Sequence, residues 1–326
     1  MANSQYPSWM TAKYLNRIAR DLQTNCELNF AAPIDTDSLF ESLEVFYTKK
    51  NIPSDANYIL NQAKGLLADE ASIIAHRLST YNQINLYELA DPNAEDIFPL
   101  VYELMDRRML NTYVAAGNSN FKNEYATQKI NFLTSYSGQR LNFGSMITDL
   151  DSGSFNKNTK VFKTNSQSDD SPTNLFVLLN STLGNMINPE RALNNISRSM
   201  ESGDLFMLSQ AIYSPGSEDT LVSDYRNNLA NLSIYREMAS VFDPGSRILT
   251  NWDDQKIQGI NISVKVEKDM ELAGAELKEG QQITLLRSTR FNDAGLKKML
   301  INASFRIISI AYDDDMNFGL YFVQKR

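Results

Sequence analysis

The chain has 326 residues, of which 42% are hydrophobic and 21% charged, so it can bury a core for one main domain with an added lobe. Its formal net charge of -8, with no local cluster of Lys and Arg, argues against nucleic acid as the main partner. The lack of an apolar run of about 20 residues, and of a basic and then hydrophobic start, predicts a soluble, cytoplasmic protein without a membrane partner.

Cysteine and histidine usage excludes several kinds of site. Cys26 is the only cysteine, which leaves no internal disulfide, thiolate metal cluster or Cys-X-X-Cys redox pair. His76 is the only histidine, and a lone histidine in a helical segment is far more often a packed or surface residue than a base. Catalysis by a His triad or by a His-ligated zinc is therefore excluded, and we expect no metal site.

Residues 1–80 have the pattern of an all-helical N-terminal lobe. Apolar side chains recur at helical spacing in three stretches, as at Leu39, Leu43 and Phe46. Pro53-Ser54-Asp55 offers an N-cap for the last of these helices.

Strands and helices alternate after this lobe, which predicts an α/β sheet. The predicted strands are Gln83–Leu89, Tyr113–Ala116 and Leu141–Ile147, and the helix Ile97–Met105 follows the first of them. The polar tract Ser152–Thr173 comes next and predicts an exposed loop.

The stretch Leu175–Tyr213 has the pattern of strand, turn, helix and strand, which predicts a βαβ crossover. Leu175–Leu179 is a continuous apolar run, as in a strand covered on both faces. It ends at the polar turn Asn180–Asn185, a helix begins near Pro189, and a second apolar run follows at Leu205–Leu208. Because ligands of open parallel sheets bind beyond the carboxyl ends of the strands, this turn is the first candidate site. The alternative is an ordinary turn whose polar side chains only hydrogen-bond backbone groups.

The rest of the chain predicts an inserted lobe and then the end of the sheet. Residues 214–287, the inserted α+β lobe, begin with a long helix, Glu218–Phe242, and continue as an antiparallel meander. The strands of this meander are predicted at Ile257–Val266, Met270–Leu277 and Gln282–Leu286. The chain closes with a helix and two strands, predicted at Asn292–Ala303, Phe305–Tyr312 and Phe318–Val323. The acidic turn Asp313–Asp315 between the two strands is expected to be solvated rather than to bind a metal.

The order of these elements predicts the fold. Residues 81–213 and 288–326 should form a doubly wound α/β sheet whose last strand is antiparallel. This is the usual layout of a Rossmann-like, class I methyltransferase core.

Three motifs of the chain have counterparts in one enzyme family. The turn Asn180-Ser181-Thr182-Leu183-Gly184-Asn185 corresponds to a Gly-Ser-Thr-Ile-Gly-Asn turn after a fourth strand. Thr148-Asp149-Leu150 corresponds to an Ala-Asp-Phe adenine clamp, and Gly280–Phe291 to a stretch that ends Ile-X-Thr-Glu-X-Ser-X-Lys-Phe/Tyr. Through these motifs the chain, from about Asp37 to its C-terminus, resembles the histidine-specific, S-adenosylmethionine-dependent methyltransferases. The resemblance implies the class I methyltransferase fold and S-adenosylmethionine as cofactor.

The resemblance also implies a cofactor site in which the family motifs are altered. The family's first strand ends in Glu-Leu-Gly-Ser-Gly, whereas this chain has Glu88-Leu89-Ala90-Asp91-Pro92. The acid that binds the ribose hydroxyls at the end of the family's second strand falls at Gly117, with the neutral amides of Asn118 and Asn120 as alternative acceptors. The cofactor-binding residues implied are Glu88, Ala90, Gly117, Asp149, Leu150 and Asn180.

A substrate site is implied in the same way. Its residues are Asn185, Tyr225, Leu286 and Ser288. The family's substrate-binding Glu falls at Leu286, Arg290 replaces a Lys, and Asn51–Asp55 replaces a Tyr-Tyr-Pro-Thr-Arg stretch. Because Leu286 cannot accept a hydrogen bond, free histidine is not the expected substrate.

Two hypotheses follow, one enzymatic and one not. In the first, the chain is an S-adenosylmethionine-dependent methyltransferase that acts on the amine of a small amino-acid-like molecule. In the second, it is a catalytically inactive pseudo-methyltransferase that serves as a scaffold, a sensor or a partner subunit, as the altered turn and Gly117 favour. The site residues also have structural alternatives: Asp149 as a turn cap, Glu88 in a local salt bridge, and Tyr225 in the core of its lobe.

Overall fold

We describe the protein from a computed structural model. The structure describes residues 58–92, 94–117, 120–135, 140–150, 172–227, 247–254, 258–272 and 274–326, with short stretches or single residues at 16, 19–20, 22–23, 138, 155, 239 and 242. These residues form two compact units. The sheet unit comprises Tyr58–Tyr213 and Phe291–Arg326, and the smaller unit comprises Ser214–Arg290 with the described residues before Tyr58.

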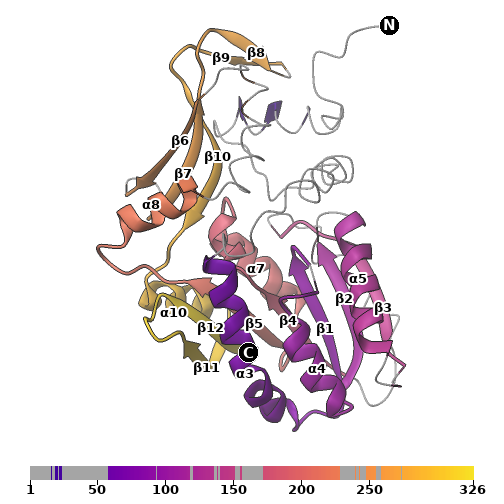
Figure 1. The fold of residues 1–326 in the computed structure, drawn as a ribbon. Helices are drawn as coiled ribbons and strands as arrows, with labels where there is room; N and C mark the ends of the chain where they lie inside the picture. Colours follow the sequence, from indigo (N-terminus) through magenta and orange to yellow (C-terminus); the bar gives the residue numbers. More distant parts are fainter. Residues whose placement is uncertain are drawn as a thin grey trace, which may run out of the picture. The chain divides into compact units, whose positions relative to one another are not determined.

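A seven-stranded sheet forms the centre of the sheet unit (Figure 1). Its strands are β1 (Ile84–Ala90), β2 (Leu110–Gly117), β3 (Asn142–Ile147), β4 (Thr173–Leu178), β5 (Leu205–Ala211), β11 (Phe305–Tyr312) and β12 (Phe318–Lys325). Their order is β11-β12-β5-β4-β1-β2-β3, and β12 is antiparallel to both of its neighbours while β1 to β5 run parallel. The predicted α/β class I methyltransferase fold is confirmed.

The helices of the sheet unit are α3 (Tyr58–Leu78), α4 (Phe98–Asp106), α5 (Asn120–Thr134), α7 (Pro189–Ser199) and α10 (Asp293–Asn302). The chain moves outward in one direction from β1 to β3, and in the other direction from β4 to β5. Because such crossovers are right-handed, α4 and α7 lie on opposite faces of the sheet (Figure 1). The direction therefore reverses between β1 and β4, which is the position where open α/β sheets bind ligands at their carboxyl edge.

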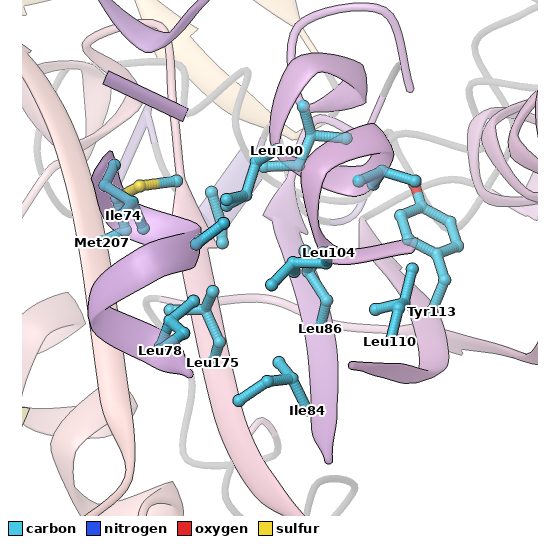
Figure 2. Packing of buried hydrophobic residues seen from close by; sticks show 14 of the residues in the cluster. Ile74, Leu78, Ile84, Leu86, Leu100, Leu104, Leu110, Tyr113, Leu175 and Met207 are labelled. Atoms are coloured by element: carbon cyan, nitrogen blue, oxygen red, sulfur yellow. The ribbon is translucent and has the colours of Figure 1, made fainter. Parts of the chain in front are cut away.

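Helices α3, α4 and α5 cover one face of this sheet with a continuous apolar cluster. Figure 2 shows Ile74 and Leu78 of α3 and Leu104 of α4 around strand residues such as Leu86 and Met207. All of these side chains are nearly inaccessible to solvent, and burying each contributes about 1.5–3 kcal/mol. Whether residues 1–80 form a lobe of their own stays a prediction, because most of the residues before Tyr58 lie outside the described part.

A chain of buried polar side chains crosses the sheet at its amino edge. Asn111 donates to Asn85 at 2.8 Å, Asn85 donates to Asn174 at 3.3 Å, and Asn174 donates to Asp204 at 2.9 Å. These residues lie at or near the starts of four adjacent strands, so the chain ties β2, β1, β4 and β5 together at the edge away from the candidate site.

The smaller unit contains a three-stranded antiparallel sheet, a two-stranded hairpin and a helix. Its elements are α8 (Glu218–Asn227), β6 (Ile248–Asp253), β7 (Gly259–Lys265), β8 (Met270–Leu272), β9 (Ala275–Leu277) and β10 (Gln282–Thr289). Two predictions were wrong here: β6 was missed, and Met270–Leu277 is two strands rather than one. The second error has a local cause, because Gly274 turns the chain with a φ of +84°.

Some predicted features fall outside the described residues. They include most of the tract Ser152–Thr173, the stretch Asn51–Asp55 and most of the long helix beyond Asn227. The acidic turn between β11 and β12 is described, and there the carboxylate of Asp313 accepts a hydrogen bond from the backbone of Phe318 at 2.8 Å. That carboxylate therefore closes the hairpin.

Candidate functional site

The predicted site residues fall into two groups, one in each unit. In the sheet unit, the predicted residues lie at the carboxyl ends of β1, β2 and β3 and in the turn after β4. They are Glu88, Ala90, Gly117, Asp149, Leu150, Asn180 and Asn185. In the smaller unit, Tyr225 lies on α8, and Leu286 and Ser288 lie on β10. The first group thus lies at one edge of one sheet, the edge that the βαβ pattern predicted for the turn Asn180–Asn185.

Glu88 is buried in the sheet unit and hydrogen-bonded to a neighbouring strand. It is only 3% exposed, and its carboxylate accepts a short hydrogen bond from the hydroxyl of Tyr113 on the neighbouring strand. Burial, reinforced by this carboxylate, raises the pKa of the Tyr113 hydroxyl well above its ordinary value, so the tyrosine stays protonated and continues to donate. This contact is a hydrogen bond within the sheet and not the local salt bridge that the structural alternative proposed for Glu88.

The turn after β1 contains a non-glycine residue, Ala90, in a backbone conformation that is usual for glycine. Ala90 has a φ of 68°, in the left-handed region that costs an L-residue about 1–2 kcal/mol. Asp91 is exposed and forms an ion pair with Lys122 of α5, which neutralises part of its charge. Pro92 is buried. The backbone of this turn therefore adopts a left-handed conformation that favours glycine, although the residue there is Ala90.

Gly117, at the end of β2, has no room for a side chain. A Cβ atom placed there would lie 2.6 Å from Cδ of Pro92 and 2.7 Å from Oδ1 of Asn123. The Asn123 amide is fully buried and held in place, because it accepts from the Gly117 N–H at 2.9 Å and donates to the Met146 carbonyl at 2.9 Å. The ribose-binding acid of the family is thus absent, and its space is filled by Pro92 and Asn123.

The segment after β3 is anchored on both sides of Asp149. Thr148 donates through its backbone to the Gly117 carbonyl at 2.8 Å and through its hydroxyl to the Ala116 carbonyl at 2.9 Å. The Leu150 carbonyl accepts a hydrogen bond at 2.8 Å from Asn195 of α7. Asp149 is half-buried between these two anchors, so its position at the sheet edge is well defined.

The turn after β4 is held to β5 by hydrogen bonds. Asn180 and Ser181 have φ angles of 60° and 57°, two successive left-handed residues. The Asn180 N–H donates to the Ser209 hydroxyl at 2.9 Å, and the Ser181 hydroxyl accepts from the Ala211 N–H at 2.9 Å. Thr182 donates to the Leu179 carbonyl at 2.6 Å. Ser181 and Thr182 therefore make the backbone contacts of an ordinary turn, which was the alternative to a binding role.

Three side-chain amides at this edge have an oxygen that accepts no hydrogen bond from the described residues. The Asn180 amide donates to Asp96, a residue 2% exposed, at 2.6 Å, and this bond identifies which amide atom is the oxygen. The side-chain oxygens of Asn180, Asn185 and Gln210 are buried and have no hydrogen-bond partner among the described residues. Gln210 is fully buried on β5. Each such oxygen costs about 1–3 kcal/mol until a donor reaches it.

In the smaller unit, Tyr225 and Ser288 are in direct contact. The Tyr225 hydroxyl donates to the Ser288 hydroxyl at 2.8 Å, across 63 positions of sequence. Arg290 is 1% exposed and donates to the Tyr225 hydroxyl at 3.2 Å. Leu286 lies on the same face of β10 as Ser288, since these residues pair with Ile262 and Ile260 of β7. Tyr225 and Leu286 also pack against the apolar cluster of this unit, so each has a structural role as well.

The sequence pattern did not identify Asp96 and Gln210 as candidate site residues, and it indicated Arg290 only as the replacement of a Lys. A signal existed for Gln210, because it and the preceding Ser209 interrupt an otherwise apolar buried strand. Asp96 lies in a loop, and nothing in its neighbourhood distinguishes it from a solvated acid. Asn120, an alternative acceptor for the ribose, is exposed at the start of α5, and Asn118 lies outside the described residues.

Two kinds of feature are absent from the part of the chain that the structure describes. No helix there is long and apolar enough to cross a bilayer. No group of three or more His, Cys, Asp or Glu side chains is placed there to hold a metal ion.

Comparisons with known proteins give the family of the chain. Among curated protein sequences none matches significantly. Similar solved structures include the glycopeptide N-methyltransferase MtfA with sinefungin (13% identity, TM-score 0.39, 79% of this chain and 86% of that one). They also include the Burkholderia thailandensis 1,6-didemethyltoxoflavin-N1-methyltransferase with bound 1,6-didemethyltoxoflavin and S-adenosylhomocysteine (11% identity, TM-score 0.42, 92% of this chain and 92% of that one). Another is the [4+2]-cyclase SpnF (9% identity, TM-score 0.42, 79% of this chain and 80% of that one). The family of histidine-specific, S-adenosylmethionine-dependent methyltransferases matches residues 49–325. The chain therefore belongs to this family, whose cofactor is S-adenosylmethionine.

Proposed function

We propose that the chain is an S-adenosylmethionine-dependent methyltransferase that acts on the amine of a small amino-acid-like molecule other than free histidine. The observation that carries this proposal is the set of buried, unpartnered amide oxygens of Asn180, Asn185 and Gln210 at one sheet edge. Oxygen acceptors without donors suit a ligand rich in N–H groups, such as an amine.

Methyl transfer to an amine requires little of the protein beyond positioning the two reactants. S-adenosylmethionine, when bound, supplies an electrophilic methyl group carried on a positively charged sulfur. The residues of the chain would hold an acceptor amine in one orientation, through hydrogen bonds from its N–H groups to the amide oxygens of Asn180 and Asn185. Orientation of this kind is a large part of the rate enhancement in many two-substrate reactions.

Only part of the expected cofactor site fits the cofactor. The left-handed Ala90 keeps the turn after β1 in a suitable shape, and Asp149 is anchored at the edge. The end of β2 does not fit the ribose in the family's manner, because no acid is present and Pro92 and Asn123 fill the space beside Gly117. We therefore expect cofactor affinity below that of relatives with a complete site.

Free histidine is a poor fit for the smaller unit. Leu286 offers no acceptor where the family has Glu, and one lost hydrogen bond to a buried donor costs about 1–3 kcal/mol, or one to two powers of ten in affinity. An assay of purified protein with free histidine should therefore yield no methylated product above background. Methylation of histidine at a rate comparable to other amines would contradict this part of the proposal.

Calorimetric titration with S-adenosylmethionine and S-adenosylhomocysteine tests the proposal as a whole. We expect both to bind, and we expect methyl transfer from the first to at least one member of a panel of small primary amines. Asn185→Ala should raise KM for that amine at least tenfold, whereas Asn194→Ala, an exposed residue on α7, should leave it unchanged. No binding of either compound up to millimolar concentration would reject the enzymatic proposal.

The second candidate is an inactive pseudo-methyltransferase, and the crowding at Gly117 is the observation that favours it. Restoring the family turn tests whether this turn limits cofactor binding. Replacement of Ala90-Asp91-Pro92 by Gly-Ser-Gly should raise affinity for S-adenosylhomocysteine at least tenfold, about 1.4 kcal/mol. If the folded triple variant binds no better than the parent, the turn is not the obstacle to binding.

A further inference from the structure

The smaller unit contains a buried cation whose hydrogen-bonding capacity is mostly unused. Arg290 follows β10 and is 1% exposed. Its Nη2 donates to the Tyr225 hydroxyl, but Nε and Nη1 are buried and have no hydrogen-bond partner among the described residues. No Asp or Glu in the described part of the chain forms an ion pair with it. Buried charges in folded proteins are normally paired, so this guanidinium lacks an anionic partner.

The surroundings of Arg290 add further donors. Arg290 donates to the Tyr225 hydroxyl, and that hydroxyl donates to the Ser288 hydroxyl at 2.8 Å. The hydrogen bonds thus run in one direction, and the hydroxyl hydrogen of Ser288 is left for a further acceptor. A guanidinium and a serine hydroxyl with unused N–H and O–H groups form a site for an acceptor that carries negative charge.

The neighbouring side chains on the same strand face do not supply that charge. Ser288 and Leu286, the preceding positions on the same face of β10, are neutral, and they pair with the apolar Ile260 and Ile262. These four positions of β10 and β7 therefore carry no acid that could pair with Arg290. One guanidinium with the unused hydroxyl hydrogen of Ser288 matches a singly charged carboxylate, whereas phosphate sites usually combine several cations or backbone N–H groups.

We infer that Arg290, with Tyr225 and Ser288, forms a binding site for the carboxylate group of a small molecule, and that this site lies wholly within the smaller unit. The inference goes beyond the proposed function, because the amide oxygens on which that proposal depends belong to the sheet unit. It assigns to Arg290 the role of a specificity residue. A neutral or cationic amine without a carboxylate should bind poorly, because it would leave the guanidinium unpaired.

Matched pairs of ligands test this assignment by calorimetry on the full chain. The probes are L-aspartate and L-glutamate, each compared with its two amides, in which one carboxylate at a time is replaced by a neutral group of the same shape. We expect at least one acid to bind at least tenfold more tightly than one of its amides, and this preference to vanish in Arg290→Gln. Arg290→Lys keeps the charge without the planar fork and should retain a reduced preference.

Stability separates a binding role from a structural one. Arg290→Gln removes an unpaired buried charge, so the ligand-free variant should have a thermal midpoint equal to or above that of the parent. A purely structural arginine would instead lower the midpoint when replaced. Tyr225→Phe, which removes one hydroxyl and keeps the ring, should weaken the preferred acid about three- to tenfold without loss of fold, and serves if Arg290→Gln does not fold.

The outcomes are distinct from those for the proposed function. If every acid binds no better than its amides, if the preference survives in Arg290→Gln, or if inorganic phosphate binds more tightly than any acid, the inference is overturned. Binding of S-adenosylmethionine without a carboxylate preference would leave the proposed function standing alone. A carboxylate preference without cofactor binding would support the site in a protein that is not an enzyme.

Discussion

The contact between Gly117 and Pro92 yields the sharpest prediction, because a single methyl group tests it. Gly117→Ala adds only a Cβ atom, which would lie 2.6 Å from Cδ of Pro92 and 2.7 Å from Oδ1 of Asn123. Carbon atoms in contact normally lie about 3.5–4.0 Å apart, so both neighbours would have to move. Both movements cost free energy, because the ring of Pro92 is rigid and Asn123 is held by two buried hydrogen bonds.

The expected cost follows from these contacts. Overpacking a core of this kind costs about 1–3 kcal/mol. Displacement of Asn123 adds the loss of its bond to the Gly117 N–H, about 0.5–1.5 kcal/mol. Gly117→Ala should therefore lower the free energy of unfolding of the sheet unit by about 2–4 kcal/mol. In a Pro92→Gly background the same substitution should cost at least about 1 kcal/mol less, because one of the two contacts is gone.

Urea denaturation followed by far-ultraviolet circular dichroism is the appropriate measurement. The two tryptophans, Trp9 and Trp252, lie outside the sheet unit in sequence, so tryptophan fluorescence would not report on it. Gly65→Ala is the matched control: it is the same substitution, at an exposed position of α3 where a Cβ would meet nothing within 4 Å. This control should stabilise the protein by up to about 1 kcal/mol through helix propensity.

Two results would refute the reasoning. One is a Gly117→Ala variant whose stability lies within about 0.5 kcal/mol of the parent, the range of ordinary surface substitutions. The other is an equal cost in the parent and in the Pro92→Gly background, which would mean that Pro92 does not fill the space beside Gly117. In either case the missing ribose acid would need another explanation than lack of room.

Three further predictions concern single residues. Ala90→Gly should leave stability unchanged or raise it by up to about 1 kcal/mol, because φ is 68° there, whereas glycine at an ordinary helix or strand position costs about 0.5–1 kcal/mol; a loss of that ordinary size in urea denaturation would contradict the left-handed conformation. Gly259→Ala should cost about 2–4 kcal/mol and disturb the position of Ser288, because its Cβ would lie 2.2 Å from the Ser288 carbonyl oxygen; unchanged carboxylate binding and stability would count against it. Asp293 has a pKa below its ordinary value, since hydrogen bonds from Lys297 and two tyrosines outweigh the opposing effect of burial. The stabilising contribution of Asp293 is therefore fully present above its pKa in the unfolded state, and it is lost as the pH falls through its pKa in the folded state. The Asp293→Asn variant should accordingly lose less stability than the parent between about pH 5 and 3. Equal losses of stability in the two proteins would rule this out.

The sequence by itself determined the order and type of most elements of the sheet unit. Continuous apolar runs such as the one in β4 indicate strands covered on both faces, and this pattern depends only on neighbouring residues. Helix starts are equally local: Asn188 and Asn292 cap α7 and α10 through bonds of 2.9 and 2.7 Å to the N–H three residues later. The strand β6 was missed because its residues, Ile248–Asp253, mix polar and apolar types without a clear alternation.

Only the tertiary structure decided what the candidate site can bind. Asp96 and Asn180 meet across 84 positions, and Tyr225 and Ser288 meet across 63. The same holds for the space beside Gly117, which depends on how the turn with Pro92 packs against the end of β2. Such contacts are set by strand register and packing, which bring distant residues within a few ångströms of each other. Periodicity along the chain carries no information about them, so the residue types could be read in advance but their partners could not.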